Sequence, residues 1–125
     1  MVNYQQTTLI SLADNHGIGF AQNKGIVFAL EKPEIGGVIL FDHDSLPEAQ
    51  MVQQLLEAWQ VLTIDGHNIG AVGPIYRDPR TLRNYPISVF QGFRLIHNYP
   101  QNKDAKPISA SFLISSGCLI DRKTF

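Results

Sequence analysis

The run Val38-Ile39-Leu40-Phe41, followed at once by Asp42-His43-Asp44, constrains the fold of this chain more than any other feature. Four consecutive apolar residues, two of them β-branched, are typical of a central strand that is covered on both faces. A strand of this kind belongs to a sheet whose neighbouring strands are joined by helices. The sequence therefore predicts an α/β fold with an inner strand at residues 38–41.

Further predicted elements alternate along the first 75 residues, which favours a mostly parallel sheet. They are short strands at 8–12 and 69–73, a helix at 19–30, and a second helix that opens at Ser45. In this second helix Ser45 is a suitable cap, Pro47 is tolerated in the first turn, and Glu48 completes a capping box. An apolar stripe then follows at Met51, Val52, Leu55, Leu56 and Trp59.

The second half of the chain carries weaker signals. The segments predicted there are an irregular stretch at 74–87, an edge strand at 89–97, a polar loop at 98–107, a strand at 111–114 and a turn at 115–117.

Composition narrows the class of protein. With 125 residues the chain is predicted to be a single domain, residues 1–125, and 44% hydrophobic residues are normal for a globular protein. Ten basic and eleven acidic side chains give a net charge of −1, which supplies no basic surface for nucleic acid. The single cysteine, Cys118, excludes an internal disulfide framework and a thiolate zinc cluster, and is expected to be buried and inert. Without a signal sequence or an apolar run of about 20 residues, the expected location is the cytoplasm.

The D-x-D of Asp42 and Asp44 is the first candidate site. Its two carboxylates would lie at the carboxyl end of a buried parallel strand, where open α/β sheets bind ligands. In an extended chain Asp42 and Asp44 point the same way, and such like charges repel unless a cation joins them. Oxygen ligands suit Mg²⁺ or Mn²⁺, which commonly bridge to a phosphate. The alternative is a polar strand end that leads into the Ser45 cap.

The second candidate site is Asp14-Asn15-His16-Gly17-Ile18-Gly19, which lies between a predicted strand and a predicted helix. Backbone N–H groups at such a helix start can hold an anion. The dinucleotide-binding fingerprint fails because Gln22 stands where it needs a third glycine. An ordinary helix start capped by Asp14 or Asn15 is the alternative. Arg77, Arg80 and Arg83 recur every third residue, but Pro79 interrupts any helix, so a solvated loop is favoured over an anion clamp.

These motifs together resemble a known family. Residues 14–26 resemble the N-x-G-I-A-x-A-x-N-x-G-I segment of family-2 GT-A glycosyltransferases, most closely that of the bacterial rhamnosyltransferase branch. Residues 38–45 resemble the hydrophobic strand and D-Q-D-S of that branch. Val72-Gly73-Pro74 and residues 112–120 resemble later family segments, so the resemblance is good over 14–59 and loose over 70–120.

The resemblance implies part of a GT-A, Rossmann-like domain, with a mixed, mostly parallel sheet flanked by helices. It implies a transferase of polysaccharide biosynthesis that moves a sugar from a nucleoside-diphosphate sugar, such as dTDP-rhamnose, to a glycan or lipid-linked acceptor. Carried over to this chain, Asp44 is the principal ligand of a divalent metal, Mg²⁺ or Mn²⁺, and Asp42 contacts the ribose or the metal. Asn15, Gly17 and Asn23 would lie near the nucleotide and the diphosphate. A membrane-peripheral position at the inner face would suit a lipid-linked acceptor.

Family members have an earlier strand and helix, and a catalytic base after the segment that 112–120 resembles. We therefore expect a fragment of a larger glycosyltransferase, truncated at both ends, in which Asp121 sits too early to be the base and the catalytic residue stays unassigned. An incomplete sheet would favour self-association into a homo-oligomer.

Two other interpretations remain open. The D-x-D also fits a haloacid dehalogenase-type phosphohydrolase, with Asp42 as nucleophile, Asp44 as acid/base and Ser115 in its second motif. The other is a non-catalytic binding or assembly module.

Overall fold

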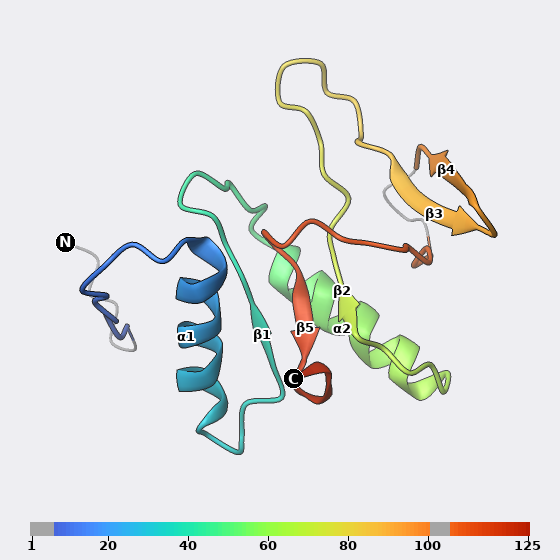
Figure 1. The fold of residues 1–125 in the computed structure, drawn as a ribbon. Helices are drawn as coiled ribbons and strands as arrows, with labels where there is room; N and C mark the ends of the chain where they lie inside the picture. The colour runs from blue at the N-terminus through green and yellow to red at the C-terminus, as the bar shows by residue number, and fades with distance from the viewer. Residues whose placement is uncertain (1–6, 101–105) are drawn as a thin grey trace. The chain divides into compact units, whose positions relative to one another are not determined.

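The structure of the chain is a computed structural model that describes residues 7–100 and 106–125 (Figure 1). The chain divides into two compact units, Met1–Gly36 and Gly37–Phe125, and each is described by itself. The described residues contain both helices and antiparallel β-structure, so the chain is a small α/β protein. The prediction of one domain over residues 1–125 stays a prediction.

The first unit is built around the helix α1, Ile18–Leu30. It begins one residue before the predicted start and ends at the predicted residue. Gly17 precedes it with φ 86°, a left-handed conformation that a glycine adopts without steric cost. Ile26 is the buried residue of this helix.

The predicted strand at 8–12 is wrong, because residues 7–12 have no strand structure. They are exposed throughout, and Leu9 keeps 88% of its surface accessible. A strand needs a partner for its backbone hydrogen bonds, and the described part of the first unit holds no other strand. Residues such as Leu9 and Ile10 therefore do not form a strand here, because the described part of this unit offers no strand for them to pair with.

The second unit contains a three-stranded sheet in the order β1-β5-β2, with β1 at Gly37–Ile39, β2 at Ala71–Val72 and β5 at Leu119–Asp121. The central strand β5 pairs antiparallel with both neighbours, and its Ile120 lies opposite Val38 on one side and Ala71 on the other. Figure 1 shows β5, from the end of the chain, between the two earlier strands.

The expected mostly parallel sheet is not confirmed. Both ladders of the sheet are antiparallel, because β5 runs opposite to β1 and to β2. The two outer strands consequently run in the same direction, as a strand–helix–strand unit requires, but a later strand separates them. The apolar runs at 38–41 and 69–73 correctly predict two strands. They do not predict that the later strand β5 lies between these two strands in the sheet.

The helix α2, Met51–Ile64, begins six residues after the predicted opening at Ser45. Its N-cap residue is Gln50, which makes no side-chain capping bond. The capping box is therefore wrong, because the Ser45 hydroxyl is engaged with Ser116 instead. Of the predicted stripe Leu55 is buried, and Met51 and Trp59 are half-buried. Its other two members, Val52 and Leu56, each remain 43% exposed.

The predicted edge strand at 89–97 is a hairpin instead, formed by β3, Ile87–Gln91, and β4, Arg94–Asn98. Gly92 has φ 61° and opens the two-residue connection, where primed turns favour glycine. The predicted strand at 111–114 does not form, and β5 begins later, at Leu119. Part of the predicted polar loop, residues 101–105, lies outside the described residues. The short 3-10 helix η1, Arg122–Thr124, follows β5.

The core of the second unit is small and gathers around β5. Its buried apolar residues are Leu55, Cys118 and Leu119. The approach of β1 to β5 is close, since a Cβ added to Gly37 would lie 2.7 Å from the Ile120 carbonyl oxygen. Gly37 is thus a residue that this strand pairing requires.

Candidate functional site

The D-x-D lies directly after β1, at a crossing of two chain segments. Leu40 forms an isolated parallel bridge with Ser116, and the Gly117 N–H donates to the Leu40 carbonyl at 2.6 Å. The chain then turns, because the Ser45 N–H donates to the Asp42 carbonyl at 3.1 Å. Since Asp42 to Ser45 form a turn, the extended-chain argument that puts both carboxylates on one face does not apply.

A pair of serine hydroxyls fixes this turn. The buried Ser116 Oγ accepts a hydrogen bond from the Asp42 backbone N–H at 3.1 Å. The same oxygen lies 2.6 Å from Ser45 Oγ, so the two hydroxyls are hydrogen-bonded. The first and last residues of the turn are therefore both bound to one buried side chain from a distant part of the sequence.

Tyr76 adds a third segment to this site. Its hydroxyl donates to the carbonyl oxygen of Ser116 and lies 3.3 Å from that of Ile114. Burial raises the pKa of Tyr76, and the negative charges of Cys118 and Asp42 raise it further. The contribution of Asp42 places its carboxylate within electrostatic reach of the tyrosine hydroxyl. At neutral pH the phenol is consequently protonated and acts as a hydrogen-bond donor.

The two carboxylates differ in accessibility, because Asp42 is half-buried whereas Asp44 and His43 are exposed. Within residues 7–100 and 106–125 no group of three His, Cys, Asp or Glu side chains is arranged to hold a metal ion. Two carboxylates nevertheless fit the way Mg²⁺ is usually held, by one or two acidic side chains together with substrate phosphates and water. The donor set thus suits an ion that a diphosphate completes.

The other predicted site residues belong to the first unit. Asn15 Oδ1 accepts a hydrogen bond from the Gly17 N–H at 2.9 Å, which closes a local turn before α1. Asn15, Gly17 and Asn23 are all exposed, Asn23 from within the helix. Neither Asp14 nor Asn15 is the cap residue, because Gly17 holds that position and no side chain caps the helix.

Asp121 has a structural role in β5. It is 7% exposed, and its Oδ2 accepts a hydrogen bond from Trp59 Nε1 at 2.9 Å. Its Oδ1 accepts from the Lys123 N–H at 2.8 Å and so caps η1. Trp59 thus belongs to the packed side of α2, as the stripe predicts, and also holds a buried carboxylate. Cys118 is buried as predicted, and its burial raises the pKa of its thiol.

The sequence pattern did not single out Ser116 and Tyr76 as members of the site. Ser116 appears in a Ser-Ser-Gly turn, and nothing local shows that the second serine faces inward while Ser115 is exposed. Tyr76 follows Pro74 in a segment predicted only as irregular. The local signal for this site is Ser45, which directly follows the D-x-D, but its position equally suits a helix cap.

Comparison with known proteins yields a relative of named activity. The chain is 29% identical over all 125 of its residues to the dTDP-rhamnosyl transferase RfbF of Shigella flexneri. It spans 40% of the length of that relative. This similarity supports a glycosyltransferase-like relationship. No family model matches the chain, and no solved structure matches it.

No helix among residues 7–100 and 106–125 is long and apolar enough to cross a membrane.

Proposed function

We propose that this chain is a donor-binding part of a rhamnosyltransferase with a GT-A-like site. In this proposal it takes a nucleoside-diphosphate sugar, dTDP-rhamnose, whose sugar is transferred to a glycan or lipid-linked acceptor. Asp42 and Asp44 would hold a divalent metal, Mg²⁺ or Mn²⁺, with Asp44 as the principal ligand. Asn15, Gly17 and Asn23 would face the nucleotide and the diphosphate.

The observation that carries this proposal is the similarity to a dTDP-rhamnosyl transferase over the full length of the chain. The geometry of the D-x-D is compatible with it. The Asp42–Ser45 turn is held by buried Ser116, while the Asp44 carboxylate remains exposed for a ligand. A fixed backbone with an exposed carboxylate suits a site that is completed when the nucleotide sugar arrives.

The transfer forms a bond from an acceptor oxygen to the sugar anomeric carbon and breaks the bond from that carbon to the diphosphate. The diphosphate leaves with the bonding electron pair, so negative charge grows on its oxygens. A divalent ion supplies positive charge at the leaving group when it is bound. The part of Asp42 and Asp44 is to position that charge. The proton of the acceptor hydroxyl needs a base, and no residue of this chain is assigned to it.

The test is a calorimetric titration of the chain with dTDP-rhamnose in the presence and absence of Mn²⁺. Wild-type protein is expected to bind only with the metal. Asp44→Ala is expected to lose that binding, whereas Asp65→Asn, which changes an exposed carboxylate after α2, keeps it.

Unchanged binding in Asp44→Ala would refute the metal site. Absence of binding by folded wild-type chain would refute donor binding by this part of the protein. Phosphate release from simple phosphate esters that is abolished by Asp42→Asn would instead favour the phosphohydrolase.

A further inference from the structure

The hairpin of β3 and β4 carries an exposed aromatic residue at its tip. Gln91 pairs with Arg94, so Gly92 and Phe93 form the two-residue turn between the strands. Gly92 has φ 61°, which suits the first position of such a turn. The second position usually holds a polar residue such as Asn, Asp or Ser, whereas here it holds Phe93, which is 108% exposed. A side chain with this exposure is not packed against the described part of the chain.

Three further exposed apolar side chains lie near this turn. Phe90 and Leu95 are directly opposite each other in the ladder, next to the pair that closes the turn, so both point to the same face of the hairpin. The Phe112 ring meets the Phe90 ring edge-on, with the two centroids 6.3 Å apart. The hairpin patch is the name used below for Phe90, Phe93, Leu95 and Phe112.

Hydrogen bonds hold the segment of Phe112 against the outer edge of β3. The Ser111 N–H donates to the Ser88 carbonyl at 3.0 Å, and Ser111 Oγ accepts from the Phe90 N–H at 2.8 Å. The contact between the Phe90 and Phe112 rings is therefore supported by the backbone on both sides.

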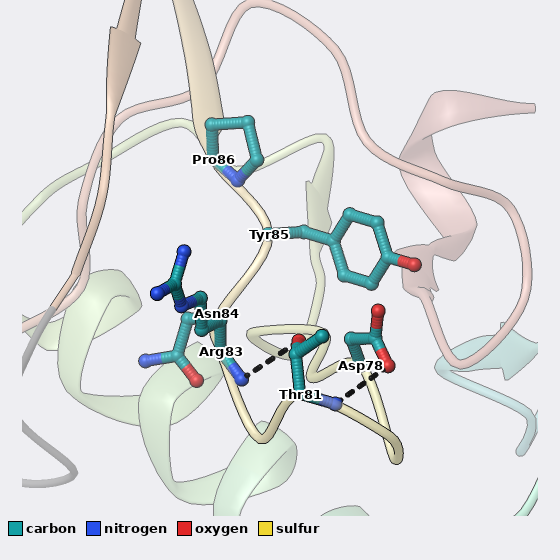
Figure 2. Close-up of a pocket in the computed structure, with 6 residues that line it drawn as sticks. All are labelled: Asp78, Thr81, Arg83, Asn84, Tyr85 and Pro86. Atoms are coloured by element: carbon teal, nitrogen blue, oxygen red, sulfur yellow. Dashed lines mark hydrogen bonds between the residues drawn. The ribbon is translucent and has the colours of Figure 1, made fainter.

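The base of the hairpin is joined to the loop that precedes it. Asn84 Nδ2 donates to the Pro100 carbonyl at 2.6 Å, which connects the residues before β3 with those after β4. Figure 2 shows Asn84 in this loop, where the Thr81 N–H donates to Asp78 Oδ1 at 3.1 Å. The hairpin patch is thus presented by a hairpin whose base is fixed.

The charge of this part of the chain distinguishes the hairpin patch from other exposed apolar residues. Residues 79–100 and 106–120 contain no acidic side chain and four basic ones, Arg80, Arg83, Arg94 and Lys106, and the five residues between the two ranges add one charge of each sign. Because the whole chain has a net charge of −1, the remaining residues carry a net charge of −5. Exposed Ile64, by contrast, directly precedes Asp65.

An anionic lipid surface matches both properties of the hairpin. Aromatic rings favour the interface between headgroups and acyl chains, and lipid phosphates attract a cation such as Arg94 beside Phe93. Nucleic acid matches less well, because its affinity depends on many phosphate contacts, and Arg94 is the one Lys or Arg in residues 87–98.

We propose that the hairpin patch binds the surface of a membrane that contains anionic lipids, with Phe93 inserted at the interface and Arg94 at the lipid phosphates. The attachment is weak and reversible, because even a single myristoyl chain binds a membrane with only about 10⁴ M⁻¹. The proposal does not depend on the proposed transfer of a sugar, and either can fail while the other holds.

The test is sedimentation of the chain with two kinds of vesicle, phosphatidylcholine alone and phosphatidylcholine with about 30% phosphatidylglycerol. The wild-type chain should bind the anionic vesicles with half-saturation at roughly 1 mM lipid, and the neutral vesicles about fivefold more weakly. Added salt should reduce this difference, because it screens the attraction between Arg94 and the lipid phosphates.

Matched variants separate the aromatic contribution from the electrostatic one. Phe93→Ala should weaken binding to both kinds of vesicle about fivefold, whereas Ile64→Ala, which also truncates an exposed apolar residue, should leave it unchanged. Arg94→Gln should weaken binding about fivefold on anionic vesicles only. Circular dichroism of each variant reports whether it is folded.

Phe93→Trp tests insertion directly. Its additional fluorescence should shift to shorter wavelength with anionic vesicles and should be quenched by brominated lipids. The emission of Trp59 in the wild-type chain, which lies in α2, should not respond to either.

Membrane binding by the hairpin patch is overturned if the folded wild-type chain does not bind anionic vesicles, or if Phe93→Ala binds them as well as Ile64→Ala does. Two other partners give distinct results that would also overturn it. A wild-type dimer that becomes monomeric in Phe93→Ala, measured by sedimentation velocity, would make the patch an interface between copies of this chain. A single-stranded oligonucleotide that binds more tightly than the vesicles and displaces them would make it a nucleic-acid site.

Discussion

Replacing Ser116 by alanine is expected to destabilise the second unit and to release the turn that carries the D-x-D. Ser116 is 6% exposed, and its hydroxyl is bonded to the Asp42 N–H and to Ser45 Oγ. Alanine keeps the backbone of the segment but removes both hydrogen bonds.

The expected loss follows from these two bonds. A buried donor left without an acceptor costs about 1–3 kcal/mol, and the Asp42 N–H falls in the lower half of this range because Asp42 is half-buried and water can reach it. Losing a neutral hydroxyl–hydroxyl bond costs about 0.5–1.5 kcal/mol, and the half-buried Ser45 can turn to solvent. The free energy of unfolding should therefore fall by about 2 kcal/mol, which corresponds to a decrease in Tm of roughly 8 °C.

Urea unfolding followed by fluorescence measures this directly. Trp59 is the single tryptophan and lies in α2, so its emission reports on the second unit. The neighbouring exposed residue provides a matched control, because Ser115→Ala makes the same chemical change without removing a buried hydroxyl.

The stabilising role of the Ser116 hydroxyl is refuted if the free energy of unfolding of Ser116→Ala lies within about 0.5 kcal/mol of that of Ser115→Ala. A coupling energy near zero between Ser45→Ala and Ser116→Ala, measured in a double-mutant cycle, would refute the contribution of the hydroxyl pair.

Four further predictions concern the sheet around β5. Trp59→Phe removes the donor to buried Asp121 and should lower the free energy of unfolding by about 1.5–3 kcal/mol in urea unfolding followed by circular dichroism; a change below about 0.5 kcal/mol would contradict the role of this bond. Gly37→Ala places a Cβ against a backbone oxygen of β5 and should cost about 1–3 kcal/mol in thermal unfolding, whereas Gly36→Ala, with open space around its Cβ, should be close to neutral. Cys118 is 3% exposed with a raised pKa, so its thiol should react with a disulfide reagent at pH 8 far more slowly in the folded chain than in urea. Because the unfolded thiol ionises first, this group should also make the fold less stable as the pH rises through the alkaline range, and a stability that stays constant there would contradict the burial of the thiol.

The local signals in the sequence predicted the two helices and the strand before the D-x-D, but not the arrangement of the sheet. The helix ending at Leu30, the strand around Val38 and the helix containing Leu55 are all present, because periodicity reports which residues are covered. Periodicity does not show which strands pair with one another in a sheet. The apolar residues at 111–114 resemble a strand as well as Leu119–Asp121 does, but the latter forms the ladders with β1 and β2.

In the candidate site, too, the local features could be predicted from the sequence and the tertiary contacts could not. The D-x-D and its position after a strand could be predicted from the sequence, because Asp42 and Asp44 directly follow the apolar run at 38–41. The hydroxyl groups that hold the turn could not be predicted, because Ser116 is distant from the turn in sequence. Its hydrogen bond to Ser45 replaces the helix cap that the local sequence favours. A capping box is a local preference worth about 1 kcal/mol, and a buried tertiary hydrogen bond is of comparable size and can override it.

The central position of β5 has a consequence for how the second unit acquires its structure. Val38 and Ala71 both pair with Ile120, so β1 and β2 have no neighbour in their sheet until residues 119–121 have been synthesised. Closing such long loops before any strand contact forms slows folding, because the entropic cost precedes the gain. During this interval the backbone of β1 offers unpaired hydrogen-bonding groups to other chains. Substitutions in Leu119–Asp121 should therefore alter the yield of native protein during expression more strongly than their effect on equilibrium stability indicates.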